Sequence, residues 1–128
     1  MAKVLVIEDN ENIRLLFEMF LTDAGHDVIL AENGARGLEI LHTDPLPNII
    51  LLDLVMPDID GHSVAENIYK DNRLSKIPII IISGSTNTPR NVIFNDAYCT
   101  YIAKPFDLDD VLTTIEKFTI PKDLNGRL

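Results

Sequence analysis

Hydrophobic positions along the chain fall into five short runs that are almost continuously apolar. Short runs rich in isoleucine, valine and leucine are typical of strands that are covered on both faces of a sheet. Pro78 precedes the fourth run, where a proline is tolerated because a strand can begin after it. The predicted strands are residues 3–7, 28–31, 48–53, 79–82 and 101–103.

Between these runs, apolar residues recur every three or four positions, which is the spacing of an amphipathic helix. Gly25 follows the first such segment as a helix stop, and Asp107 begins the last one as a cap with an acidic first turn behind it. The predicted helices cover residues 13–21, 34 to before Pro45, about 63–70, a short segment after Thr88-Pro89, and 107–118.

The chain therefore repeats a strand and a helix five times. Right-handed crossovers between parallel strands place the helices on both faces of one sheet, which predicts a doubly wound α/β/α fold. The helix stripes are expected to face the sheet, with Phe17 and Phe20 in the first helix and Ala35, Leu38 and Leu41 in the second.

Composition fits one domain over residues 1–120 with a C-terminal tail at 121–128. The chain has 128 residues, 46% of them hydrophobic, which is enough for a sizeable core. A net charge of −9 argues against binding to nucleic acid or to an anionic membrane surface. A single cysteine, Cys99, excludes an intrachain disulfide and favours a reducing, cytoplasmic location. No apolar stretch approaches the length of a membrane span, and His26, His42 and His62 are expected at the surface or at helix caps.

Polar residues follow or end four of the predicted strands. Glu8 and Asp9 follow the first strand, Asp53 ends the third, Ser83 follows the fourth and Lys104 follows the fifth. Parallel α/β sheets bind ligands outside the carboxyl ends of their strands. These residues are therefore expected to share one site.

Three neighbouring carboxylates in that site point to a bound cation. Two such charges repel by about 4 kcal/mol at 4 Å and an effective dielectric of 20, so a cation or a shifted protonation must offset the repulsion. An all-oxygen site with few protein ligands suits Mg²⁺, or Mn²⁺ in its place, and leaves room for phosphate oxygens. A carboxylate held beside a metal ion is a usable nucleophile for phosphoryl transfer, which depends mainly on position and charge neutralisation.

Taken together and in order, these segments resemble the receiver domain of two-component response regulators, in the CheY-like superfamily. The resemblance covers residues from about 3 to 118 and rests on the motifs at the strand ends. Those motifs are Glu8-Asp9, Asp53 to Pro57 with Asp60-Gly61 beyond, Ser83-Gly84, and Tyr101 to Phe106. It implies the flavodoxin-like strand order 2-1-3-4-5, whose switch point lies between the strands that end at Glu8-Asp9 and at Asp53.

The resemblance also implies a role for each site residue. Asp53 accepts a phosphoryl group from a histidine kinase or a histidine phosphotransfer protein, in a Mg²⁺-dependent reaction. Asp9, Asp53 and the Val55 backbone carbonyl bind the metal ion, and Glu8 acts through a metal-bound water. Lys104 and the Ser83 hydroxyl contact the phosphoryl oxygens.

Phosphorylation is then expected to switch the binding of a downstream protein. By the resemblance, the Tyr101 side chain swings inward when Ser83 moves. The surface that changes its binding then comprises the helix after Thr88-Pro89, the last strand and the last helix. A stand-alone signalling protein, monomeric or dimerising on phosphorylation, is expected rather than an enzyme. The family holds the Lys104-Pro105 bond in cis, and glutamate at position 8 and serine at position 83 are variants of its pattern.

Three other classes of protein have an acidic strand end or the same fold. A phosphatase of the haloacid dehalogenase group would need a second aspartate where Val55 stands. A flavodoxin-type cofactor protein would need a phosphate-binding loop in place of the acidic residues after Ile7. A pseudo-receiver, a pure interaction module, would normally lack the acceptor, an acidic partner or the lysine, and this chain keeps all three.

Overall fold

A five-stranded parallel sheet in the order β2-β1-β3-β4-β5 organises the chain. The computed structural model describes residues 2–43, 45–53, 61–83, 99–103 and 107–119. Its elements are β1 (Lys3–Ile7), α1 (Glu11–Asp23), β2 (Asp27–Ala31), α2 (Gly34–Leu41), β3 (Ile49–Asp53), α3 (Gly61–Lys70), β4 (Ile79–Ser83), β5 (Cys99–Ala103) and α4 (Leu108–Thr119). The predicted fold and strand order are confirmed.

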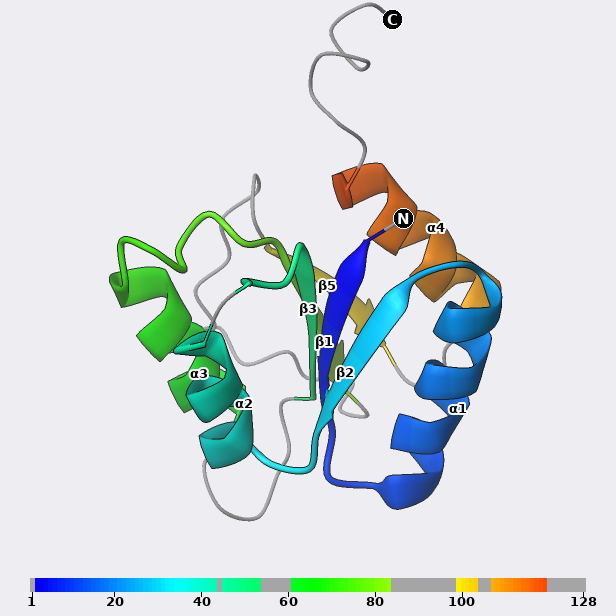
Figure 1. Ribbon diagram of the computed structural model, residues 1–128, viewed down its shortest axis with the longest axis horizontal. Coiled ribbons are helices and arrows are strands. Elements are labelled where there is room, and N and C mark those ends of the chain that lie inside the picture. Colours follow the sequence, from blue (N-terminus) through cyan, green and yellow to red (C-terminus); the bar gives the residue numbers. More distant parts are fainter. Residues whose placement is uncertain (1, 44, 54–60, 84–98, 104–106, 120–128) are drawn as a thin grey trace, which may run out of the picture.

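Helices cover both faces of the sheet, as Figure 1 shows, with α1 and α4 on one side and α2 and α3 on the other. Each side has its own apolar core, because successive strand residues point to opposite faces. The core beneath α1 and α4 includes Val4, Val6, Phe17, Leu21, Ile49, Leu51, Val111 and Ile115. The core beneath α2 and α3 includes Leu5, Ile7, Leu41, Ile50, Leu52, Val64, Ile68 and Ile81.

The central strands are buried along almost their whole length. All five residues of β3 are buried, and so are the last four of β1. The register pairs Val4 with Ile49 and Ile7 with Leu52. The residues that follow at the carboxyl ends of β1 and β3 are consequently neighbours.

Side-chain caps fix where three of the helices begin. The Asn10 side chain accepts a hydrogen bond from the Ile13 N–H at 3.1 Å, and Asn33 caps α2 in the same way. Asp107 precedes α4 and its Oδ1 accepts from the Asp109 N–H at 2.8 Å, as its sequence position predicted. After α1, Gly25 adopts a φ of 95°, a left-handed conformation that glycine tolerates.

Several boundaries differ from the predicted ones. Strand β5 begins at Cys99 rather than Tyr101, and α3 begins at Gly61. The helix predicted after Thr88-Pro89 lies outside the described residues. In α2 the expected stripe was wrong at Ala35, which is exposed, because Gly34 and Gly37 face the sheet together with Leu41.

The surface position expected for His26 was also wrong. The residue is buried, with 7% exposure, and its Nδ1 accepts a hydrogen bond from the Ala2 backbone N–H at 3.0 Å. His42 is exposed at the C-terminal cap of α2, in line with the prediction.

None of the helices in the described ranges combines the length and the apolar composition that crossing a bilayer requires.

Candidate functional site

Three carboxylates meet at the carboxyl ends of β1 and β3. One carboxylate oxygen from each of Glu8, Asp9 and Asp53 lies within 4.8 Å of the others. Glu8 and Asp53 are buried, with 2% and 5% exposure, whereas Asp9 is exposed. The acidic cluster predicted from the strand ends is therefore assembled, and Asp9 lies on its solvent side.

The cluster is costly to keep fully ionised. Burial raises the pKa of Glu8 from its ordinary value of 4.5 to about 7, assisted by a hydrogen bond to the Asp53 side chain and by the Asp53 charge. The Asn10 backbone N–H, which donates to Glu8 Oε2 at 3.1 Å, acts in the opposite direction. A proton on Glu8 is one way to relieve the crowding of negative charge, and a divalent cation is the other.

The donor set fits a hard divalent cation. Three carboxylate oxygens within 4.8 Å of one another can approach one ion, and oxygen ligands are those that Mg²⁺ binds. With few protein ligands, such an ion keeps coordination positions for water or for phosphate oxygens.

Hydrogen bonds hold the acidic turn between β1 and α1. The Glu8 N–H donates to the Ala31 carbonyl of β2 at 3.0 Å. From the first turns of α1, Arg14 Nη1 donates to the carbonyl oxygens of Glu8 and Asp9, at 2.8 and 2.9 Å. Sequence reasoning missed both Arg14 and the contact of Asn10 with Glu8, although a cation within two helical turns of the acidic pair was a usable signal.

The other predicted site residues are described only in part. Ser83 is the last residue of β4 and pairs with Ala103, so its backbone lies at the same end of the sheet as Asp53. Tyr101 lies within β5 and pairs with Ile81. Val55 and Lys104, with the Lys104-Pro105 bond, lie outside the described residues.

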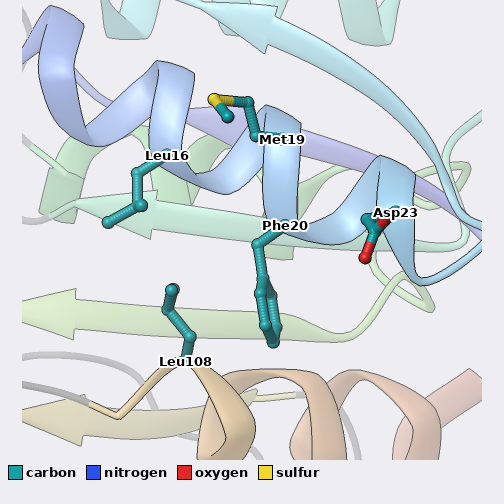
Figure 2. Close-up of a pocket in the computed structure, with 5 residues that line it drawn as sticks. All are labelled: Leu16, Met19, Phe20, Asp23 and Leu108. Atoms are coloured by element: carbon teal, nitrogen blue, oxygen red, sulfur yellow. The ribbon is translucent and has the colours of Figure 1, made fainter.

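A separate apolar groove of about 330 Å³ lies between α1 and the start of α4. In Figure 2, Leu16 and Phe20 of α1 point toward Leu108, and Asp23 lies at the far end of the helix. Met19 also lines the groove and is 71% exposed. Glu18, Thr22 and Asp23 border the adjoining hollow, so the described lining of both is apolar or acidic apart from the neutral polar side chain of Thr22. Contiguous exposed apolar surface of this kind commonly contacts other proteins.

A doubly wound parallel sheet with an acidic cluster at its switch point defines the class of receiver domains. The chain belongs to the response regulator receiver domain family, whose model matches residues 4–116. Members of this family are signalling phosphoacceptors that histidine kinases phosphorylate, and they bind Mg²⁺ at an acidic pocket.

Relatives of similar length and longer ones both match the chain. It is 30% identical to protein PilH of Pseudomonas aeruginosa over 116 residues. The alignment covers 90% of this chain and 95% of PilH. This chain is equally identical over 116 residues to the DNA-binding dual master transcriptional regulator RpaA of Synechocystis, and 34% identical over 119 residues to the sensor histidine kinase CheAY of Helicobacter pylori. The chain spans only 48% of RpaA and 15% of CheAY.

Solved structures agree with the fold. The chemotaxis protein CheY4 of Vibrio cholerae superposes with a TM-score of 0.80 at 25% identity, covering 92% of this chain and 98% of that one. The response regulator TrrA of Thermotoga maritima, solved in complex with Mg²⁺–BeF, gives 0.79 at 27% identity, covering 92% and 99%.

Proposed function

We propose that the chain accepts a phosphoryl group on Asp53 from a phosphohistidine of a histidine kinase or histidine phosphotransfer protein, in a Mg²⁺-dependent reaction. The observation that carries the proposal is the meeting of Glu8, Asp9 and Asp53, with carboxylate oxygens within 4.8 Å of one another. A cluster of this kind can gather one divalent ion and leave one carboxylate as the acceptor.

In the proposed reaction, an Asp53 carboxylate oxygen forms a bond to phosphorus while the phosphorus–nitrogen bond of the donor phosphohistidine breaks. The electron pair of that bond returns to the donor imidazole, which takes up a proton, and Asp53 becomes an aspartyl phosphate. Asp9, Asp53 and the Val55 backbone carbonyl would hold the metal ion, with Glu8 acting through a water. Bound Mg²⁺ supplies neutralisation of the charge on the carboxylates and on the phosphoryl oxygens.

Two further residues complete the proposed site. By the family resemblance, Lys104 pairs with phosphoryl oxygens and the Ser83 hydroxyl donates to another. A phosphoryl group adds about −1.5 to −2 of charge at neutral pH and three acceptor oxygens, which draws such groups toward it. Tyr101 would follow Ser83, and the change would alter binding of a downstream protein.

Labelling with acetyl phosphate tests the acceptor. We expect wild type to incorporate phosphate in Mg²⁺ but not in EDTA, and Asp53→Asn to incorporate none. Asp27→Asn is the matched control, because Asp27 is an exposed residue that begins β2 at the opposite edge of the sheet. Full labelling of Asp53→Asn would falsify the assignment.

The same experiment separates the alternatives. A pseudo-receiver would stay unlabelled in Mg²⁺ while keeping its partners. An aspartate-nucleophile phosphatase would hydrolyse many equivalents of acetyl phosphate rapidly.

Light scattering with and without Mg²⁺ and BeF₃⁻, the reagents present in the TrrA complex, distinguishes a monomer from a phosphorylation-dependent dimer.

The groove between α1 and α4 supports contact with the phosphodonor protein. Its apolar residues and the acidic side chains of Glu18 and Asp23 suit a donor helix whose apolar face is flanked by lysine or arginine. Phosphotransfer profiling against purified histidine kinases of the same organism would identify the donor. Met19→Glu should then slow transfer from that kinase and leave acetyl phosphate labelling unchanged; equal loss with both donors would exclude this surface.

A further inference from the structure

Arg14 reaches back from α1 to the acidic turn. Its backbone N–H donates to the Asn10 carbonyl at 2.9 Å, as the first turn of α1 requires. Its side chain is half-buried, and one terminal nitrogen, Nη1, donates to the carbonyl oxygens of Glu8 at 2.8 Å and Asp9 at 2.9 Å. A single guanidinium nitrogen therefore joins two consecutive peptide groups.

These two bonds fix the backbone from which two of the three carboxylates extend. The Glu8 carbonyl belongs to the peptide that joins Glu8 to Asp9, and the Asp9 carbonyl belongs to the next peptide along. The Glu8 N–H is held from the other side by the Ala31 carbonyl at 3.0 Å. With three successive peptide groups hydrogen-bonded, the Cα atoms of both acids have little freedom to move.

The guanidinium engages carbonyls and not carboxylates. Within the described part of the chain, Arg14 forms no ion pair with Glu8, Asp9 or Asp53. An arginine that paired with the carboxylates would compete with a cation for the same oxygens. Bound to the backbone, Arg14 orients the acids without occupying the ligand atoms.

We propose that Arg14 is a positioning residue for the metal site: it holds the Glu8–Asp9 turn in the conformation that binds Mg²⁺. The inference rests on the proposed function, because it assumes that the cluster binds the ion. Groups that orient metal ligands from outside the coordination shell typically change metal affinity by about 10–100-fold when they are removed.

Calorimetric titration of the apo protein with MgCl₂ tests this role. Arg14→Met keeps the apolar stem but removes the donors and the charge, and we expect it to raise the Kd for Mg²⁺ about tenfold. Arg14→Lys keeps a charged donor on a different stem and should recover part of the affinity. Arg36→Met is the control for charge, since Arg36 on α2 is exposed and pairs with Glu39; its Kd should stay within about twofold of wild type because exposed charges at a distance are screened.

A second readout follows the turn itself. The Asn10 N–H donates to Glu8 Oε2, and we expect its amide hydrogen to exchange faster in Arg14→Met than in wild type or Arg36→Met. If circular dichroism shows that Arg14→Met does not fold, the test uses Arg14→Gln instead. Glutamine is a good helix former but has neither the reach nor the charge of arginine, so the same loss of Mg²⁺ affinity is expected.

Either of two results would overturn the inference: an Arg14 variant that binds Mg²⁺ as tightly as wild type, or an equal loss of affinity in Arg36→Met. Failure of the proposed function gives a different result, because wild type itself would then show no Mg²⁺ binding and no Mg²⁺-dependent labelling. If wild type binds Mg²⁺ and is labelled, and Arg14→Met binds Mg²⁺ equally well, only the role of Arg14 is rejected and the proposed function stands.

Discussion

The side chains of Glu8 and Asp53 share a hydrogen bond, although Glu8 follows β1 and Asp53 ends β3, far apart in the sequence. The register that pairs Ile7 with Leu52 makes them neighbours, and both are almost fully buried. A buried carboxyl that bonds to a carboxylate must keep its proton to do so. The site therefore favours either a proton on Glu8 or a cation in the cluster.

In the metal-free protein, we expect Glu8 to lower the free energy of unfolding as pH rises. The pKa of Glu8 is about 7 in the folded protein against an ordinary value of 4.5, so between these values the folded state holds more protons than the unfolded state. Stability from this group is complete below pH 4.5 and is lost as pH rises through 7. One pKa unit corresponds to about 1.4 kcal/mol, which makes the total loss up to roughly 3 kcal/mol.

Urea unfolding in EDTA at a series of pH values measures this effect against Glu8→Gln. Glutamine stays neutral, so the stability of the variant relative to wild type should rise between pH 4.5 and 7 and then level off. A difference that stays constant across this range would show that Glu8 does not titrate with a raised pKa.

Asp53→Asn should stabilise the protein without the metal ion and lose that advantage when the metal ion is bound. Without Mg²⁺ the substitution removes one charge from a crowded cluster, and we expect the unfolding free energy to rise, by up to about 3 kcal/mol for one pair at an effective dielectric of 20. With Mg²⁺ at 100 times its Kd, wild type gains about 2.7 kcal/mol through binding, and the variant should gain much less. Thermal melts in EDTA and in MgCl₂ give both values, with Asp27→Asn as the control that should respond as wild type does.

The fold and the acidic cluster were predictable because they depend on patterns that repeat locally. The run from Ile49 to Leu52 is continuously aliphatic and became a strand with every residue buried. Since parallel strands end at one edge of the sheet, Asp53 and Glu8 were expected to meet from the pattern alone.

Contacts that depend on distance in space were not predictable in the same way. The position of Arg14 close after the acidic pair did not show that its side chain bends back to two carbonyl oxygens, and nothing indicated that the Ala2 N–H takes His26 as its acceptor. Likewise, the periodicity of α2 favoured Ala35 as a buried residue, whereas close approach of the helix to the sheet requires the missing side chain of Gly37.

His26→Ala should destabilise the protein at the edge of the sheet opposite the acidic site. The substitution leaves the buried Ala2 N–H without its acceptor, which typically costs about 1–3 kcal/mol. Glu116→Gln should have little effect, because the Glu116 carboxylate lies 3.9 Å from His26 Nε2 and is half exposed. Urea unfolding of both variants checks the prediction, and an equal loss in the two would mean that the contact with Glu116, rather than the backbone hydrogen bond, is what matters.

Gly37→Ala should destabilise the protein, although alanine is the better helix former. In an exposed helix interior this change would stabilise by about 1 kcal/mol. Here the added Cβ would meet Cδ1 and Cγ1 of Ile7 at distances below those that real Cβ atoms show. Ile7 is fully buried and directly precedes Glu8, so its side chain, α2 or β1 must shift, with an expected loss of about 1–3 kcal/mol. Ile7→Val removes Cδ1, so the double variant should lose less than the two single losses added together, and a thermodynamic cycle from urea unfolding measures the difference. If the losses simply add, the contact between Gly37 and Ile7 does not set the spacing of α2 on the sheet.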